Sequence, residues 1–375
     1  MAQKIVGLDW LRAIAAILVM IGHARAFLFV DFSELANDST VVAKVFYLLT
    51  GLGTYSVIIF FVLSGYLVAG SVDRAYHEGR WSWKEYAVHR VVRLGIVLLP
   101  VLVMTAMFDW LGASQFDPAY YRGEFGAEFA SAPNEPVANG VLVFLGNAFF
   151  LHNIIVPVYG SNGPLWSIAY EFWYYVAFPL GFFALKPGRY QLFFAALFVL
   201  TMWFIGLDLA VLFPTWLFGY FAWKARDGLL GRLVATKAIY ALAVVFALFV
   251  VMSALKFVND YSIGSLYITA VAAFFAVIAL SNPVFDHGAR LAEFLSKISY
   301  SLYLVHFPLM ALLSSMRHVA RFDALGNGMV LFGVYILSSF LLAWCVHWLF
   351  ERHTATLQRA ILRSMRQRPR LGAAE

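Results

Sequence analysis

Long runs of apolar residues are the feature that most limits how this chain can fold. Ten blocks approach the roughly 20 residues that a helix needs to cross a bilayer, and the polar stretches between them are too short to fold separately. Charged residues make up 13% of the 375 residues, about half their share in a soluble domain. We therefore predict an all-α, multi-pass membrane protein. The ten predicted spans are 8–30, 53–70, 90–108, 165–185, 190–206, 208–223, 237–255, 262–281, 293–316 and 328–350.

The positively charged residues indicate how these spans are oriented. If the N-terminus is cytoplasmic and the segment 141–157 does not cross, 21 of the 27 Lys and Arg residues lie on the cytoplasmic side, as the positive-inside rule requires. Segment 141–157 is short and contains several polar residues, so we predict a re-entrant or interfacial segment there. Both termini are then cytoplasmic. The chain divides into a transmembrane domain over 1–355 and a basic cytoplasmic tail over 356–375.

The net charge of +6 could also suit a nucleic-acid-binding protein. The basic residues lie in short segments between predicted spans, so we interpret them as a topology signal and expect no nucleic-acid partner. Cys345 is the only cysteine, which excludes an internal disulfide and a cysteine metal site.

Two polar residues in the first predicted span point to a function. Arg12 and His23 are eleven residues apart, which is three helical turns plus about 20°, so they share one face about 16 Å apart along the axis. An ionisable side chain costs at least about 2.5 kcal/mol at mid-bilayer unless it faces a cavity or a partner. Arg12 alone could extend to the interface, and His23 alone could bond another helix. Together they indicate a polar channel through the protein.

Two other spans carry titratable residues at a similar predicted depth. Glu171 lies about 9 Å below the outer surface on a face that includes Ser167, and His306 lies about 20 Å above the inner end on a face that includes Tyr303. His23 lies about 22 Å above that end by the same count. We therefore predict a site formed by His23, Glu171 and His306. Two histidines and a carboxylate can bind zinc, but their sequence spacing gives no support for a metal, and we predict none.

A basic cluster precedes the apolar part of the third span. Arg90 and Arg93 are spaced i, i+3 on one helical face, and Arg80 lies ten residues earlier. The positive-inside rule alone could explain them. Paired arginines also suit phosphate, which makes this cluster a candidate anion site.

The stretch LDWLRAIAAILVMIGH, residues 8–23, resembles the opening R-x10-H motif of the acyltransferase-3 family of integral membrane acyltransferases. Later stretches resemble further landmarks of this family in the same order. Each motif is weak alone, but the ordered set is specific and covers about residues 5 to 355. These later stretches are FFVLSGYL (60–67), HRVVRLGIVLLP (89–100), WSIAYEFWYY (166–175), ISYSLYLVHFPL (298–309) and FER (350–352).

The resemblance implies an enzyme of the bacterial cytoplasmic (inner) membrane that uses a cytoplasmic acyl-CoA, with acetyl-CoA as the expected donor. The acceptor would be a hydroxyl of an extracytoplasmic polysaccharide or lipid-linked sugar. Arg12 matches the family arginine, His23 its essential histidine, and Glu171 the glutamate of the WSxxxE motif. The chain departs from common versions at Gly95 and Val97, where the arginine-rich motif often continues.

This reading assigns a role to each candidate residue. Arg90, Arg93 and Arg80 would hold the CoA phosphates, and the pantetheine arm would pass Arg12 towards His23. His23 would act as general base or form an acyl-histidine, oriented by Glu171 or His306. Candidate oxyanion or positioning groups are Ser64, which could instead serve helix packing, Ser167 and Tyr303.

The alternative function is a proton-coupled transporter or flippase in which His23, Glu171 and His306 form a proton relay. We find no inverted repeat in the sequence to support it.

Overall fold

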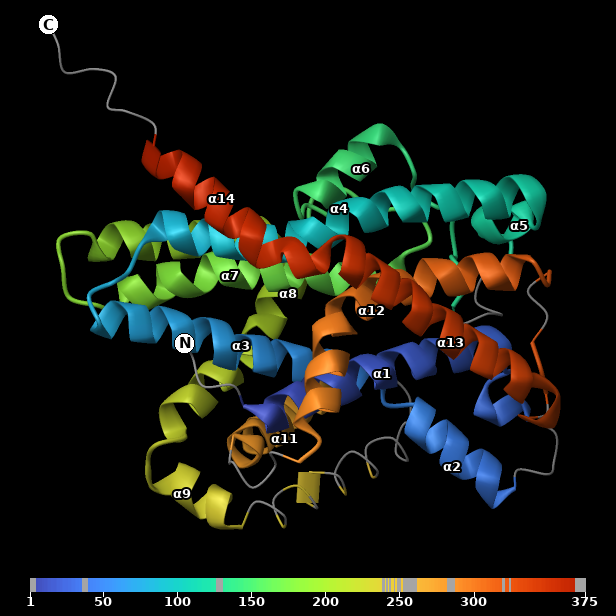
Figure 1. Cartoon of the computed structure of the whole chain (residues 1–375), viewed down its shortest axis with the longest axis horizontal. Helices are drawn as coiled ribbons and strands as arrows, with labels where there is room; N and C mark the ends of the chain where they lie inside the picture. Colours follow the sequence, from blue (N-terminus) through green and yellow to red (C-terminus); the bar gives the residue numbers. More distant parts are fainter. Residues whose placement is uncertain are drawn as a thin grey trace, which may run out of the picture.

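The computed structural model describes residues 5–35, 40–125, 131–237, 262–281, 287–318, 321–323 and 325–367, with single positions at 240, 242, 244, 245, 247 and 251. The described residues form helices and no β-strand (Figure 1). Three short 3-10 helices cover Phe32–Glu34, Gly163–Leu165 and Glu351–His353. The α-helices are α1 (Val6–Leu28), α2 (Val41–Thr50), α3 (Gly53–His77), α4 (Trp83–Gln115), α5 (Pro118–Tyr121), α6 (Val141–Ala148), α7 (Trp166–Ala184), α8 (Gln191–Ala225), α9 (Leu229–Thr236), α11 (Ile263–Leu280), α12 (Ala289–Ser315), α13 (Leu325–Leu349) and α14 (Thr354–Gln367).

Seven of the described segments are long and apolar enough to cross a membrane, and they contain α1, α3, α4, α8, α11, α12 and α13. This confirms the prediction of an all-α, multi-pass membrane protein. α7 lies within the predicted span 165–185 but is not one of these seven segments. Its sequence includes tryptophans, tyrosines and a glutamate. The predicted span 237–255 lies largely outside the described residues, so the count of ten spans stays a prediction.

α8 consists of two helical halves that fold back on each other at Gly206. This residue has φ 79° and ψ 173°, a left-handed φ that glycine adopts without a Cβ clash. On α7, Phe183 contacts Phe194 of the first half, and the adjacent Phe182 contacts Tyr220 of the second half. Both ends of α8 therefore return to the same end of α7. The two halves correspond to the two apolar blocks that the sequence separates at this point.

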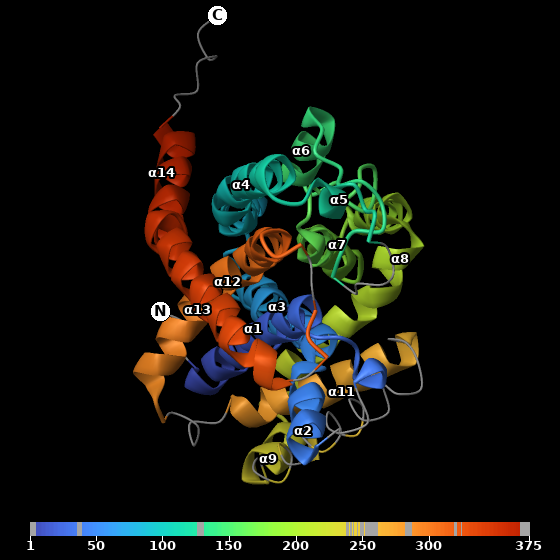
Figure 2. The ribbon, with the colours of Figure 1, turned by 90° about the vertical axis from the view of Figure 1, so that its right-hand side faces the viewer.

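The helix directions alternate as a multi-pass topology requires. Hydrogen bonds and ring contacts at two places along each helix pair show that α1, α4 and α12 run in one direction, and α3, α7 and α13 in the other. Figure 2 looks along the bundle and shows α1 and α3 near its middle, with α12 beside them and α13 and α14 along one side. The side of the membrane at each end of the bundle stays a prediction.

Glycines allow α3 and α8 to approach closely. A Cβ atom on Gly65 would lie 2.0 Å from the carbonyl oxygen of Trp216, and one on Gly219 would lie 2.0 Å from that of Val62. Close backbone contact of this kind is a common way for membrane helices to associate, because the lipid supplies no hydrophobic driving force between them. The α3–α8 contact places Ser64, which precedes Gly65, at the centre of the bundle.

Two predicted segments outside the main spans have clear local structure. In 141–157, α6 is 8 residues long, which gives a rise of about 12 Å at 1.5 Å per residue, well short of a hydrocarbon core about 30 Å thick. This length agrees with a segment that does not cross. At the C-terminus, α14 packs against α4 through Gln358, whose side-chain amide donates to the carbonyl of His89 (3.2 Å). The predicted boundary at 355 falls at the start of this helix, and residues 368–375 lie outside the described residues.

Candidate active site

A cavity of about 300 Å³ lies among α1, α3, α4, α7 and α12. We call it the arginine cavity, because three arginines line it. Phenylalanines, leucines and valines form much of its wall, and polar side chains from these five helices and from α14 line it. Its polar lining residues are Arg12, Ser64, His89, Arg90, Arg93, Ser167, Glu171, Tyr175, Ser299, Tyr300, Tyr303 and Gln358.

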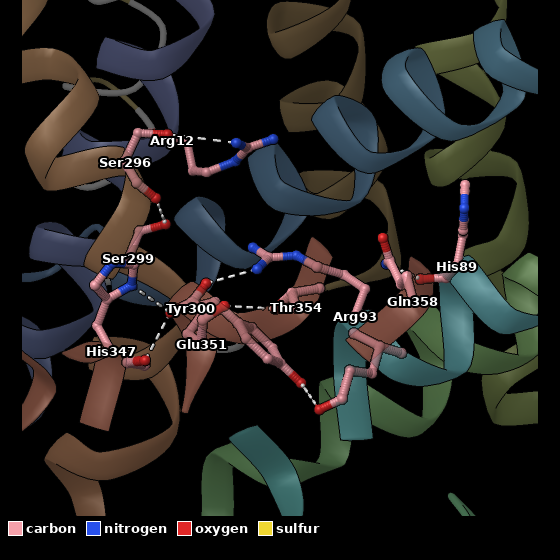
Figure 3. Close-up of polar contacts among 12 residues, drawn as sticks. Arg12, His89, Arg93, Ser296, Ser299, Tyr300, His347, Glu351, Thr354 and Gln358 are labelled. Atoms are coloured by element: carbon pink, nitrogen blue, oxygen red, sulfur yellow. Dashed lines mark hydrogen bonds and ion pairs between the residues drawn. The ribbon is translucent and has the colours of Figure 1, made fainter. Parts of the chain in front are cut away.

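The two arginines of the basic cluster differ in their partners. Arg93 forms a 2.6 Å ion pair with Glu351 (Figure 3). The guanidinium of Arg90 lies over the rings of Tyr86 and Tyr175, 5.5 and 5.7 Å from their centroids. Its Nε is buried and has no hydrogen-bond partner among the described residues. Of these two arginines, Arg93 is neutralised by a carboxylate, whereas Arg90 lines the cavity without an ion-pair partner among the described residues.

Glu351 lies in the FER stretch (350–352) that resembles a family landmark, but the sequence analysis assigned it no role. Its side chain is 3% exposed and accepts hydrogen bonds from Arg93 and from the hydroxyl of Ser301 (2.6 Å), with His347 Nδ1 3.3 Å away (Figure 3). The available signal was an acidic residue directly after an apolar span, on the side where basic residues gather. Glu351 fixes Arg93 in the wall of the arginine cavity.

Arg12 and Arg80 occupy different surroundings. Arg12 lines the arginine cavity, and its guanidinium donates to the hydroxyl of Ser296 on α12 (3.3 Å), which itself donates to Asp9 (Figure 3). Arg80 lies outside the cavity, with its side chain 69% exposed and paired with Glu78. The structure therefore does not bring Arg80 to the other predicted CoA-binding arginines.

Glu171 also lines the arginine cavity. Its Oε1 accepts hydrogen bonds from Ser64 (2.9 Å) and from the hydroxyl of Tyr175. Ser64 in turn accepts a hydrogen bond from the indole N–H of Trp216 (3.2 Å). Ser64 lines the cavity and also joins α3 to α7 and α8 through these hydrogen bonds. The role of Ser64 and Glu171 in catalysis stays a prediction.

A second cavity of about 240 Å³ lies towards the other end of α1. We call it the histidine cavity, because His23 lines it. Its wall comes from α1, α3 and α12 and from the turn that leads into α7. Its lining residues are Val19, His23, Gly53, Thr54, Val57, Gly163, Pro164, Trp166, Tyr303 and Phe307.

The hydrogen bonds of the two histidines decide which nitrogen of His23 is free. Nδ1 of His306 lies 2.9 Å from the carbonyl oxygen of Leu302. A carbonyl can only accept, so this nitrogen carries the proton, and Nε2 of a neutral His306 is an acceptor. Nε2 of His306 lies 2.9 Å from Nδ1 of His23, which must therefore donate. With both rings neutral, Nε2 of His23 keeps its lone pair and can accept a proton from a ligand.

Two residues line both cavities. Tyr303 and Val57 belong to the wall of the arginine cavity and to that of the histidine cavity. The hydroxyl of Tyr303 lies 2.7 Å from that of Ser167 and also bonds the carbonyl of Pro164 (3.2 Å). The predicted positioning residues Ser167 and Tyr303 therefore lie together where the two cavities adjoin.

The prediction that His23, Glu171 and His306 lie at one depth is only partly correct. His23 and His306 meet, but Glu171 lies deeper, in the arginine cavity. The physical reason is the start of α7. Asn162 is fully buried and its side-chain amide donates to the carbonyl of Leu304, so the chain enters α7 well inside the bundle. Counting from the edge of the apolar block therefore placed Glu171 too near the outer surface.

The described residues contain no group of three or more histidine, cysteine or acidic side chains arranged to hold a metal ion. The polar groups instead form an arginine cavity and a histidine cavity that share a wall. No curated protein and no solved structure matches the chain. The model of the acyltransferase-3 family, described as an acyltransferase domain, matches residues 5–348. The chain therefore belongs to the acyltransferase-3 family and is a membrane acyltransferase.

Proposed function

We propose that this enzyme moves an acyl group, with acetyl as the expected case, from cytoplasmic acyl-CoA to a hydroxyl of a cell-surface sugar outside the bacterial cytoplasmic membrane. The observation that carries this proposal is the pair of adjoining cavities. One holds cationic side chains suited to phosphates, and the other holds a histidine with a free lone pair. They share Tyr303 and Val57, so a slender thioester arm could reach from one to the other.

The arginine cavity suits the phosphate end of the donor. Guanidinium groups bind phosphate through two parallel hydrogen bonds, and Arg90 lines this cavity without a carboxylate partner among the described residues. Arg12 lies further along the route to His23, about 16 Å from it by the helical rise. This separation is comparable to the length of an extended pantetheine arm, so the thioester would reach the shared wall while the phosphates stay near Arg90.

The histidine cavity suits proton transfer. The acceptor hydroxyl would give its proton to Nε2 of His23 while its oxygen attacks the thioester carbonyl carbon. The carbon–sulfur bond then breaks, and the protonated histidine returns the proton to the CoA thiolate. His306 acts as a positioning residue in this scheme, because its Nε2 fixes the proton on Nδ1 of His23. A general base of this kind typically contributes about 10²–10⁴-fold to the rate.

Tyr303 and Ser167 are the groups nearest to where the thioester would lie. Their hydroxyls bond each other and the carbonyl of Pro164. One of these two hydroxyl hydrogens could turn to the thioester oxygen while the other keeps the bond to Pro164. We propose that Tyr303 stabilises the developing oxyanion in this way, a contribution worth about 10²–10³-fold where single donors have been removed.

The donor half of the proposal can be tested by binding alone. We expect Arg90→Gln to weaken the affinity for acetyl-CoA while leaving that for acetyl-pantetheine, which lacks the nucleotide phosphates, unchanged. Arg80→Gln is the matched control, because Arg80 is paired with Glu78 outside the cavity. Equal affinity for acetyl-CoA in all three proteins would remove the phosphate role from Arg90.

The transfer half is tested with His23→Ala in sealed vesicles that receive acetyl-CoA on the cytoplasmic face only. We expect this variant to bind acetyl-CoA with wild-type affinity and to lose transfer by at least about a hundredfold, the loss expected for a missing general base. A His23→Ala protein with near wild-type transfer would refute the assignment.

A further inference from the structure

The histidine cavity differs from the arginine cavity in charge. No lysine, arginine, aspartate or glutamate is among the described residues that line the histidine cavity. Arg25 lies two residues beyond His23, but its guanidinium sits over the ring of Tyr47 and 4.0 Å from Asp31, on the side of α2. No described lysine, arginine, aspartate or glutamate side chain in the wall of this cavity could therefore pair with a charged ligand group.

An unpaired charge in such a place is strongly unfavourable. Moving an ionised carboxylate or phosphate away from water is expensive unless a counter-charge and hydrogen bonds replace its hydration. The arginine cavity supplies counter-charges through Arg12, Arg90 and Arg93. The arginine cavity therefore favours anionic parts of a ligand, and the histidine cavity favours uncharged parts.

The wall of the histidine cavity contains the aromatic side chains of Trp166, Tyr303 and Phe307. Phe307 packs edge-on against His23, with ring centroids 5.0 Å apart, and Trp166 packs edge-on against Tyr170 at 5.0 Å. The rings of Phe307 and Trp166 are thus fixed by their neighbours. At about 240 Å³, the cavity is smaller than the roughly 300–1,000 Å³ of pockets for drug-sized ligands, which suits one ring and a short acyl group.

Two glycines in this wall are not required by the fold. Neither Gly53 nor Gly163 has a positive φ. A Cβ on Gly163 would meet only the ring of Phe307, at 3.6 Å, and one on Gly53 would meet the backbone of α1 at 3.7 Å, both ordinary contact distances. The contrast is Gly65, where a Cβ would lie 2.0 Å from a backbone oxygen. Alanine would therefore fit in the free protein.

A glycine that packing does not require still has a cost, because it loses more conformational freedom on folding than alanine does. Both glycines line the cavity. A methyl group on Gly163 would lie beside the ring of Phe307, which also lines it, and would narrow the space between them.

We propose that the histidine cavity receives an uncharged, hydroxyl-bearing ring, and that Gly163 and Gly53 keep it wide enough for that ring. For the acceptor this means a neutral sugar residue and not a uronate or a phosphorylated sugar at the acylated position. This identification of the ring as the acceptor rests on the proposed function. The charge and size preference of the cavity is a property that can be measured without any transfer activity.

The charge preference is tested with a cysteine at Thr54, which lines the cavity, in a Cys345→Ala background that has no other cysteine. The probes are methyl methanethiosulfonate, which is neutral, and its anionic sulfonatoethyl and cationic trimethylammonioethyl counterparts. Asn134→Cys is the reference, because Asn134 is exposed and lies outside the segments that are apolar enough to cross a membrane. We expect the ratio of neutral to charged modification rates to be at least about tenfold higher at Thr54→Cys than at Asn134→Cys. Equal ratios at the two positions would overturn the proposal.

The size preference is tested in the same Thr54→Cys protein with benzyl methanethiosulfonate, a neutral reagent that carries a ring. We expect the benzyl reagent to react at a rate comparable to that of the methyl reagent. Gly163→Ala should slow the benzyl reagent several-fold and leave the methyl reagent unchanged. Gly333→Ala is the control, because a Cβ there meets no atom within 4 Å. Exclusion of the benzyl reagent without any substitution would refute a ring-sized occupant, and the proposed transfer reaction would be unaffected by that result.

Discussion

Replacing His306 with phenylalanine or with glutamine should have different effects on transfer. His306 is fully buried, donates to the carbonyl of Leu302 and accepts from Nδ1 of His23. Phenylalanine fills a similar space but offers no acceptor. Glutamine offers both functions, because its amide N–H can donate to Leu302 and its carbonyl oxygen can accept from His23. The comparison therefore separates the hydrogen bond from the packing of the ring.

The size of the effect follows from the bond that is lost. Phenylalanine at 306 leaves the Nδ1–H of His23 buried without a partner, at a cost of about 1–3 kcal/mol. A factor of ten in rate corresponds to about 1.36 kcal/mol, so transfer should fall by about 5- to 150-fold if this cost appears in the transition state. His306→Gln should stay within about tenfold of the wild type, because glutamine keeps both hydrogen-bonding functions, and a weakened bond loses at most its net worth of about 0.5–1.5 kcal/mol.

The assay is steady-state acyl transfer in vesicles, with acetyl-CoA binding measured on the same preparations. Both variants should bind acetyl-CoA as the wild type does, since His306 does not line the arginine cavity. His23→Ala should be more damaging than His306→Phe, because it removes the base itself. The positioning role would be refuted if His306→Phe transferred at the wild-type rate, or if glutamine and phenylalanine were equally damaging.

Two further predictions concern the ion pair and the topology. Glu351→Gln should lower the free energy of unfolding by about 1.5–3 kcal/mol, the worth of a hydrogen bond to a charged group. Acetyl-CoA should raise the Tm of this variant more than that of the wild type, because a phosphate then supplies the counter-charge that Arg93 has lost. A thermal scan in which the variant has the Tm of the wild type would contradict this account. In a Cys345→Ala background, single cysteines at Asn134 and Ile155, which are both exposed, should react with an impermeant maleimide from the outer side, and labelling from opposite sides would show that 141–157 crosses.

The sequence by itself determined the class of the protein. Apolar blocks near 20 residues long can only be helices in a bilayer, because every backbone N–H and C=O must be satisfied within the segment. The eleven-residue spacing of Arg12 and His23 placed both on one helical face, and these two residues line the two cavities of the structure. The resemblance of the ordered motifs also identified the family.

Local patterns were less informative where the chain enters or leaves a span. The sequence placed Glu171 too near the outer surface, because α7 begins next to the buried Asn162 and therefore starts inside the bundle. Arg80 was grouped with Arg90 and Arg93 because a basic cluster in sequence does not show which side chains reach a cavity. Arg80 lies in the loop between α3 and α4, where it pairs with the neighbouring Glu78 at the surface.

Tertiary structure alone decided the chemistry available to each residue. The partners of His23 and Arg93, which are His306 and Glu351, lie 283 and 258 residues away along the chain. Such pairings depend on how whole helices cross, and no local spacing encodes them. The same holds for the wall that Tyr303 and Val57 contribute to both cavities, because it forms only where α12 and α3 meet. The sequence determines which groups enter the membrane, and the packing of the helices determines which of them can act together.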